Sequence, residues 1–83
     1  MNTYQISAQF QCPNDNSFDT YRITIRSKQT ILCEAICKAI ADLQDEPIFQ
    51  ETLTRTLAEQ LKSQVSIEGE HFGVQVSSTW GEP

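Results

Sequence analysis

Hydrophobic residues change their spacing along this chain of 83 residues, from every second position in the first third to every third or fourth position in the middle. Alternation over residues 3–12 and 20–27 is typical of half-buried strands, because successive side chains of a strand point to opposite faces. The segment 13–19 between them is rich in residues that favour turns. These three segments predict a hairpin with a long loop.

The alternation also predicts how the two strands pair. An arrangement that puts every apolar residue on one face has these partners: Phe10 with Tyr21, Ala8 with Ile23, and Ile6 with Ile25. The opposite face then carries glutamine, serine, threonine and arginine side chains. We expect that face to be solvated, as is common in antiparallel sheets.

From Leu32 to Leu61 the apolar spacing is that of amphipathic helices. Ser27 or Thr30 is the expected cap of the first helix. Pro47 divides the segment, because proline lacks the amide proton needed inside a helix but suits a first turn. We therefore expect two helices, with a single kinked helix as the alternative.

The last segment contains a shift of phase, since Val65 and Ile67 are apolar at odd positions and Phe72 to Val76 at even ones. A tight turn at Gly69-Glu70 explains the shift as a second hairpin. A bulge in one continuous strand is the alternative. The tail, residues 77–83, is polar, and we expect it to fray apart from its tryptophan.

Together these patterns predict a single small α+β domain over residues 1–83, in the order ββααββ. It has two layers, an antiparallel sheet covered on one face by two helices. The alternative order is ββαβ, with one kinked helix and a bulged last strand.

Composition narrows the classes of partner. Six basic and eleven acidic residues give a net charge of −5, and this field repels the phosphates of nucleic acids. The first residues show no basic leader with an apolar run, and no stretch approaches the ~20 apolar residues of a membrane span. Three cysteines form no even, dense set of the kind found in small secreted scaffolds. We expect a cytoplasmic protein with reduced thiols and no direct contact with nucleic acid or membrane.

The cysteines and the single histidine form the strongest candidate for chemistry. Cys33 and Cys37 lie four residues apart on a predicted helix, and Cys12 and His71 could complete a zinc site. The spacing is not diagnostic, and free cysteine commonly behaves as a small buried hydrophobe. We interpret Cys33 and Cys37 as core-filling residues and His71 as an exposed residue at a strand end. We assign no catalytic residue, no metal site and no cofactor.

Acidic side chains concentrate where the predicted elements end, Arg22 and Arg26 lie on the exposed face of the predicted sheet, and a tryptophan lies in the tail. Such groups can form a docking surface for a protein with a basic patch. The residues expected to bind that partner are Asp15, Asp19, Arg22, Arg26, Asp45, Glu46, Glu68, Glu70 and Trp80.

The resulting hypothesis is a non-enzymatic, acidic protein-binding module: an accessory, adaptor or inhibitor that occupies the surface of another protein. By analogy of size and charge alone, it could be a phage or mobile-element inhibitor of a complex that handles nucleic acid. One alternative is a redox or metal-responsive regulator built on its cysteines. Another is a structural homo-oligomer that associates through sheet edges.

Overall fold

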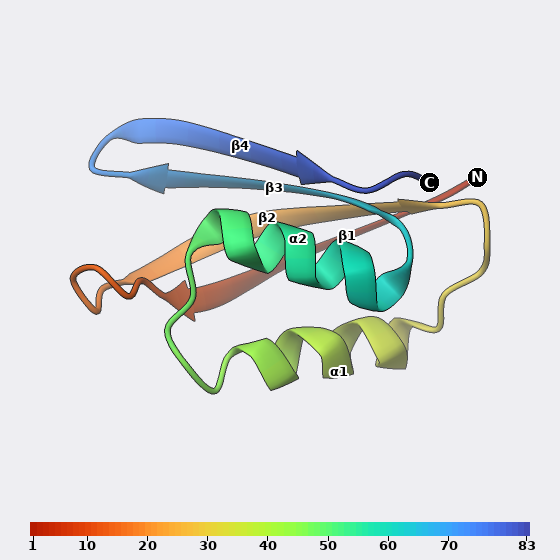
Figure 1. Ribbon diagram of the computed structural model, residues 1–83, viewed down its shortest axis with the longest axis horizontal. Coiled ribbons are helices and arrows are strands. Elements are labelled where there is room, and N and C mark those ends of the chain that lie inside the picture. The colour runs from red at the N-terminus through yellow and green to blue at the C-terminus, as the bar shows by residue number, and fades with distance from the viewer.

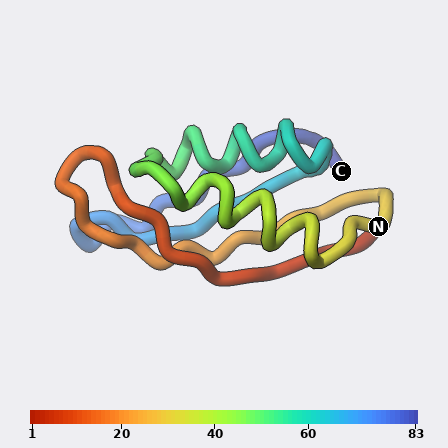
Figure 2. The backbone as a smooth tube through the Cα atoms, turned by 90° about the horizontal axis from the view of Figure 1, so that it is seen from below, coloured from red at the N-terminus to blue at the C-terminus, as the bar shows by residue number.

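The computed structural model describes residues 1–83 as a four-stranded antiparallel sheet with two helices on one face (Figure 1). The elements are β1 (Asn2–Gln11), β2 (Phe18–Ser27), α1 (Cys33–Leu43), α2 (Gln50–Leu61), β3 (Gln64–His71) and β4 (Val74–Trp80). Seen along the sheet, both helices lie on the same side of it (Figure 2). The predicted order ββααββ and the two-layer architecture are confirmed.

The strands pair in sequence order, so β1 and β4 form the edges of the sheet. The predicted register of the first hairpin is wrong by two residues, because Phe10 lies opposite Asp19 and Ala8 opposite Tyr21. β2 begins at Phe18, and the shorter loop is closed by the amide of Cys12, which donates to the carbonyl of Ser17 at 2.8 Å. A shift of two residues leaves each side chain on its predicted face. Association through the two edges stays a prediction.

Neither helix begins with a side-chain cap, and the prediction of Ser27 or Thr30 in this role is wrong. Leu32 and Phe49 occupy the capping positions with extended backbones. The hydroxyl of Ser27 instead accepts a hydrogen bond from the amide of Gln29. Pro47 lies in the link between α1 and α2, so the expected division into two helices is confirmed.

The core fills the space between the inner face of the sheet and the two helices. The buried residues contributed by the sheet alternate along β2 and β3, whereas those of the helices recur every three or four residues. The apolar core consists of Phe10, Tyr21, Ile23, Ile25, Ile36, Ile40, Leu53, Leu57, Ala58, Val65 and Ile67.

The second hairpin exists, but its turn lies at Phe72-Gly73 and not at Gly69-Glu70. Phe72 and Gly73 have φ values of 53° and 80°, as the favoured primed hairpin turns require. His71 pairs with Val74, and no bulge interrupts β3.

The tail is also more ordered than predicted. Residues 77–80 belong to β4, and the carbonyl of Pro83 accepts a hydrogen bond from the amide of Lys28. The two termini therefore lie at the same end of the sheet, and the loop between β1 and β2 lies at the other end (Figure 1). No helix of the structure combines the length and the apolar character needed to cross a membrane. A cytoplasmic location stays a prediction.

Candidate functional site

In Figure 1, the loop after β1 and the turn after β3 lie at the end of the sheet opposite the termini. A hollow of about 280 Å³ is lined by residues of both segments. It forms where β1 and β3 end and α2 begins. The lining combines a thiol, a phenol, an imidazole, two amides and a carboxylate with three apolar walls. The residues are Cys12, Asn14, Tyr21, Phe49, Gln50, Glu51, His71, Phe72 and Val76.

The imidazole of His71 is the centre of a hydrogen-bond network behind this hollow. Its Nε2 lies 2.8 Å from Oε1 of Gln50 and 3.4 Å from the hydroxyl of Tyr21. The amide nitrogen of Gln50 donates to the carbonyl oxygens of Ile67 and Val76, at 3.0 and 2.9 Å. The first residue of α2 is thus connected to both strands of the second hairpin, and the ring of His71 is held in one orientation.

Asp19 lies on the other side of the ring. Its Oδ2 is 3.4 Å from Nδ1 of His71, and the two side chains are only 17% and 25% exposed. This oxygen is buried and has no hydrogen-bond partner. The contact is therefore an ion pair when the ring is charged, and it is too long for a good charge-assisted hydrogen bond.

Cys12 is half-buried directly after β1 and contributes the only thiol of the hollow. The neighbouring loop is ordered by Asp15, whose Oδ1 accepts hydrogen bonds from the amide and the hydroxyl of Ser17 at 3.0 and 2.7 Å. These bonds from Ser17, with a smaller contribution from Cys12, lower the pKa of Asp15. The thiol is thus close to an ionised loop carboxylate and lines the same hollow as His71.

Tyr21 is a neutral hydroxyl at the back of the hollow. Burial, with smaller contributions from the negative charges of Asp19, Cys12 and Glu51, raises its pKa to about 12. Its ring stacks on Phe10 with centroids 6.0 Å apart and lies 5.7 Å from the ring of His71. At neutral pH this side chain can donate a proton in a hydrogen bond but carries no charge.

Gly69 makes room for this arrangement. A Cβ atom at this position would lie 2.5 Å from two ring carbons of Tyr21 and 3.1 Å from Oε1 of Gln50. Both distances are shorter than an ordinary van der Waals contact. A side chain at residue 69 would therefore push the tyrosine and the glutamine away from His71.

Two phenylalanines and a carboxylate form the mouth of the hollow. Phe49 and Phe72 are 52% and 87% exposed, which is unusual for large apolar side chains. Glu51 is exposed, lies on the first turn of α2, and forms no ion pair. The mouth can thus hold a flat apolar surface and accept hydrogen bonds from N–H groups.

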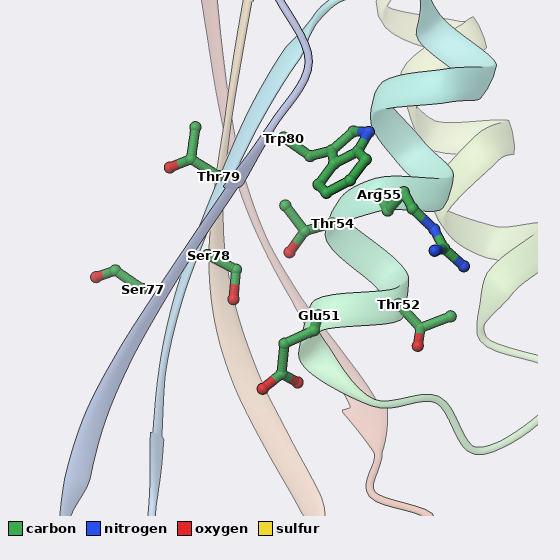
Figure 3. Close-up of a pocket in the computed structure, with 8 residues that line it drawn as sticks. All are labelled: Glu51, Thr52, Thr54, Arg55, Ser77, Ser78, Thr79 and Trp80. Atoms are coloured by element: carbon green, nitrogen blue, oxygen red, sulfur yellow. The ribbon is translucent and has the colours of Figure 1, made fainter.

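A second depression lies between α2 and the edge strand β4 (Figure 3). Ser78 and Trp80 point from β4 toward α2, whereas Ser77 and Thr79 point to the other face (Figure 3). The groove measures about 410 Å³ but contains no thiol and no histidine. Although the groove is larger, it lacks the thiol and the imidazole that the hollow around His71 contains.

The residues predicted to bind a partner do not share one surface. Arg22, Arg26, Glu68 and Glu70 lie on the outer face of the sheet, with Arg22 opposite Glu68. Glu68 and Glu70 belong to β3, so their predicted place at a turn is wrong.

The remaining predicted residues are spread over other parts of the molecule. Asp45 and Glu46 lie in the link between the helices, and Trp80 lies on β4 beside α2. Asp15 is in the first hairpin loop, as expected. Asp19 was expected in that loop as well, but it lies on β2 and is half-buried. Of the nine residues, Asp19 alone belongs to the network around His71.

The alternative of a zinc site with four ligands is wrong, because the four residues do not lie together. Cys33 and Cys37 lie on α1 beside Tyr4 and Ile6 of β1, away from Cys12 and His71. No group of three or more potential metal ligands is formed. Cys33 and Cys37 are exposed, so the interpretation of these two thiols as core-filling residues is also wrong.

The comparisons with known proteins concern the fold. Neither a protein-family model nor a curated protein matches this sequence. Among solved structures, the apo form of the archaeosine synthase QueF-Like is similar, with a TM-score of 0.87 and 16% identity over 98% of this chain and 91% of that one.

The chain has the fold of an enzyme. This finding overturns the hypothesis of a non-enzymatic binding module, which rested on the absence of catalytic motifs and on the small size of the domain. Nearly the whole length of a synthase chain is matched, so a domain of this size and layout is compatible with an enzyme subunit. The likeness at this identity shows the fold and not the reaction.

Sequence reasoning missed Tyr21 and Gln50 as functional residues, and its interpretation of His71 as exposed is wrong, because that side chain is only 25% exposed. Tyr21 was assigned to the core, where its ring does lie, but its hydroxyl reaches the hollow. Gln50 is a 2% exposed polar residue on the inner face of α2. Its place in the helical period, three residues before Leu53, was the available indication that an amide is buried there.

Proposed function

We propose that the hollow is the active site of a cysteine-dependent enzyme that acts on a flat, base-like ring. The observation that carries this proposal is the buried Oδ2 of Asp19, which has no hydrogen-bond donor and lies behind His71. A nucleophile next to an imidazole that is oriented by a carboxylate is a recurrent arrangement in nucleophilic catalysis. Cys12 is the nucleophile that lines this hollow.

The chemistry is the addition of a thiolate to an electron-poor carbon that is double- or triple-bonded to nitrogen or oxygen. The sulfur of Cys12 forms a bond to the carbon, and one π-electron pair moves to the attached heteroatom. That heteroatom takes a proton from the His71–Asp19 pair, either directly or through the hydroxyl of Tyr21, which lies 3.4 Å from Nε2 of His71. The proton that leaves the thiol of Cys12 returns to the His71–Asp19 pair, so the net step adds S–H across the multiple bond and leaves the pair unchanged.

The mouth supplies the recognition of the ring. Phe49 and Phe72 offer apolar faces for stacking. The carboxylate of Glu51 can accept two N–H hydrogen bonds from the edge of a nitrogen-rich ring. The structural neighbour is named as an archaeosine synthase, and a nucleoside base is the class of substrate that these groups suit.

The test uses purines that carry a nitrile substituent, with intact-mass spectrometry as the measurement. We expect one covalent adduct per chain, located at Cys12 by peptide mapping and formed at least tenfold faster than adducts at Cys33 or Cys37. The variant Cys12→Ser should form no adduct at that rate. Cys33→Ser is the matched control and should react like the native chain.

Two results would contradict the proposal. One is labelling of the exposed Cys33 and Cys37 ahead of Cys12, which would reflect exposure alone. The other is an unchanged rate at Cys12 in the variants Asp19→Asn and His71→Phe, which would show that the pair does not assist the thiol or its adduct.

A further inference from the structure

We propose that Cys33 and Cys37 form a two-thiolate site for Cu(I) between α1 and the edge strand β1. Both thiols are free and exposed, and they line one depression that shares no residue with the hollow around His71. Binding of the ion there does not depend on the proposed function.

The two cysteines lie on one face of α1, one helical turn apart. Cys33 is the first residue of the helix, and Cys37 follows four residues later. Side chains with this spacing are neighbours on a helix, with Cβ atoms about 5–6 Å apart. Both residues line the same depression of about 150 Å³. The two thiols therefore open into one shared space.

This spacing does not suit a disulfide bond between the two cysteines. A disulfide brings the Cβ atoms to about 3.5–4.5 Å from each other, which is closer than one turn of helix allows. The first turn of α1 would have to open, although the amide of Ile36 donates to the carbonyl of Leu32 there at 3.2 Å. The helix thus favours a reduced pair, in which both sulfurs stay available to a ligand between them.

The walls of the depression are mostly apolar. Ile36 of α1 is 5% exposed, and Tyr4 and Ile6 of β1 are half-buried. The hydroxyl of Tyr4 accepts a hydrogen bond from the amide of Ile31 at 2.9 Å, which fixes this wall. No carboxylate and no imidazole line the depression. Its donor set is therefore two soft sulfur atoms against an apolar surface.

This donor set selects the ion. Thiolates favour Cu(I), zinc and the iron of iron–sulfur clusters. Zinc in a structural site takes four ligands, and iron–sulfur clusters are held by four cysteines, whereas this depression supplies two. Two thiolates are sufficient for Cu(I). Binding breaks two S–H bonds and forms two S–Cu bonds, and both protons pass to the buffer.

The position of Cys33 at the start of α1 favours the charge of the complex. One Cu(I) ion and two thiolates carry a net charge of −1. The amide groups at the start of a helix stabilise negative charge, and no side chain caps this end of α1. The bound form is thus stabilised by the same element that spaces the thiols.

The test is an anaerobic titration of the reduced chain with Cu(I), in competition with a chromophoric Cu(I) chelator. We expect one Cu(I) per chain, and a native mass spectrum should show it on the monomer. With one equivalent of copper, Cys33 and Cys37 should be protected from alkylation, while Cys12 is alkylated as in the metal-free chain.

Four variants separate the paired geometry from the mere presence of thiols. Cys33→Ser and Cys37→Ser each leave one sulfur and should lower the affinity for Cu(I) at least 100-fold. Cys12→Ser is the matched control and should keep the native affinity. The double variant Cys37→Ser with Ala41→Cys keeps two exposed thiols, but two turns, about 12 Å, apart along the helix. It should bind no better than Cys37→Ser.

Native affinity in either single serine variant or in the respaced double variant would overturn the inference. Protection of Cys12 in place of the helical pair, or copper that joins two chains, would overturn it as well. If a serine variant does not fold, as judged by circular dichroism, the respaced variant and the protection pattern of the native chain decide. A chain that binds no copper but forms the purine adduct at Cys12 would refute this inference alone.

Discussion

The close approach of Tyr21 to β3 makes Gly69→Ala a sharp test of the site geometry. The added Cβ would lie 2.5 Å from two carbons of the Tyr21 ring and 3.1 Å from Oε1 of Gln50. Tyr21 and Gln50 are 1% and 2% exposed, so neither can move into solvent without opening the core. The ring must tilt or β3 must shift.

The expected loss of stability follows from the overlap between the added Cβ and the ring of Tyr21. Carbon atoms in contact normally lie about 3.5–4.0 Å apart, so the ring must give way by roughly 1 Å. Overpacking of this kind costs about 1–3 kcal/mol in a close-packed core. For a domain of this size, each kcal/mol lowers Tm by about 4–8 °C, so we expect a loss of about 4–24 °C.

The assay is thermal unfolding followed by circular dichroism, with Gly73→Asn as the control. Residue 73 has a φ of 80° and nothing within 4 Å of an added Cβ, and asparagine tolerates this conformation. We expect little change in Tm for Gly73→Asn. In the double variant with Tyr21→Val, the cost of Gly69→Ala should fall by at least half, since the clashing ring is gone. A Tm of Gly69→Ala within 2 °C of the native value would refute the reasoning.

Two further predictions concern Phe72 and Tyr21. Phe72 has a φ of 53°, a conformation that is unfavourable for a bulky residue. Phe72→Asn should therefore raise the free energy of unfolding by about 0.5–1 kcal/mol in urea titrations. If Phe72 also holds the substrate ring, adduct formation at Cys12 should slow in the same variant, and an unchanged rate would exclude that role. The pKa of Tyr21 is raised to about 12, above its value of about 10 in unfolded chains, so its contribution to stability is complete below pH 10 and is lost between pH 10 and 12. Urea unfolding across this range should show a steeper loss for the native chain than for Tyr21→Phe, and equal slopes would contradict the raised value.

Sequence patterns predicted the fold because its main determinant is periodic. Alternation in β1 and β2 and the helical spacing around Leu53 and Leu57 assign each side chain to the inner or the outer face, and the structure confirms those faces. Alternation does not determine the register in which the strands pair. A two-residue shift preserves every face, so alternation alone could not distinguish Phe10 opposite Tyr21 from Phe10 opposite Asp19.

The buried amide of Gln50 illustrates a second limit. Its neighbour Leu53 is buried as the apolar period requires, but Gln50 and Thr54 are buried beside it although they are polar. Both polar side chains form hydrogen bonds. The amide of Gln50 donates to backbone carbonyls of β3 and β4, and the hydroxyl of Thr54 donates to the carbonyl of Gln50. Partners of this kind come from distant segments, so a single sequence cannot reveal them.

The candidate site could not be recognised from the sequence because two strand boundaries were placed wrongly. With the turn at Gly69-Glu70, His71 starts the last strand as an exposed residue. With the turn at Phe72-Gly73, His71 continues the inner alternation of Val65, Ile67 and Gly69 and lies behind the same hollow as Cys12. Asp19 is displaced in the same way, since starting β2 at Phe18 brings it into the alternation of Tyr21 and Ile23. Two boundary shifts therefore convert a loop acid and a strand-end histidine into a half-buried pair.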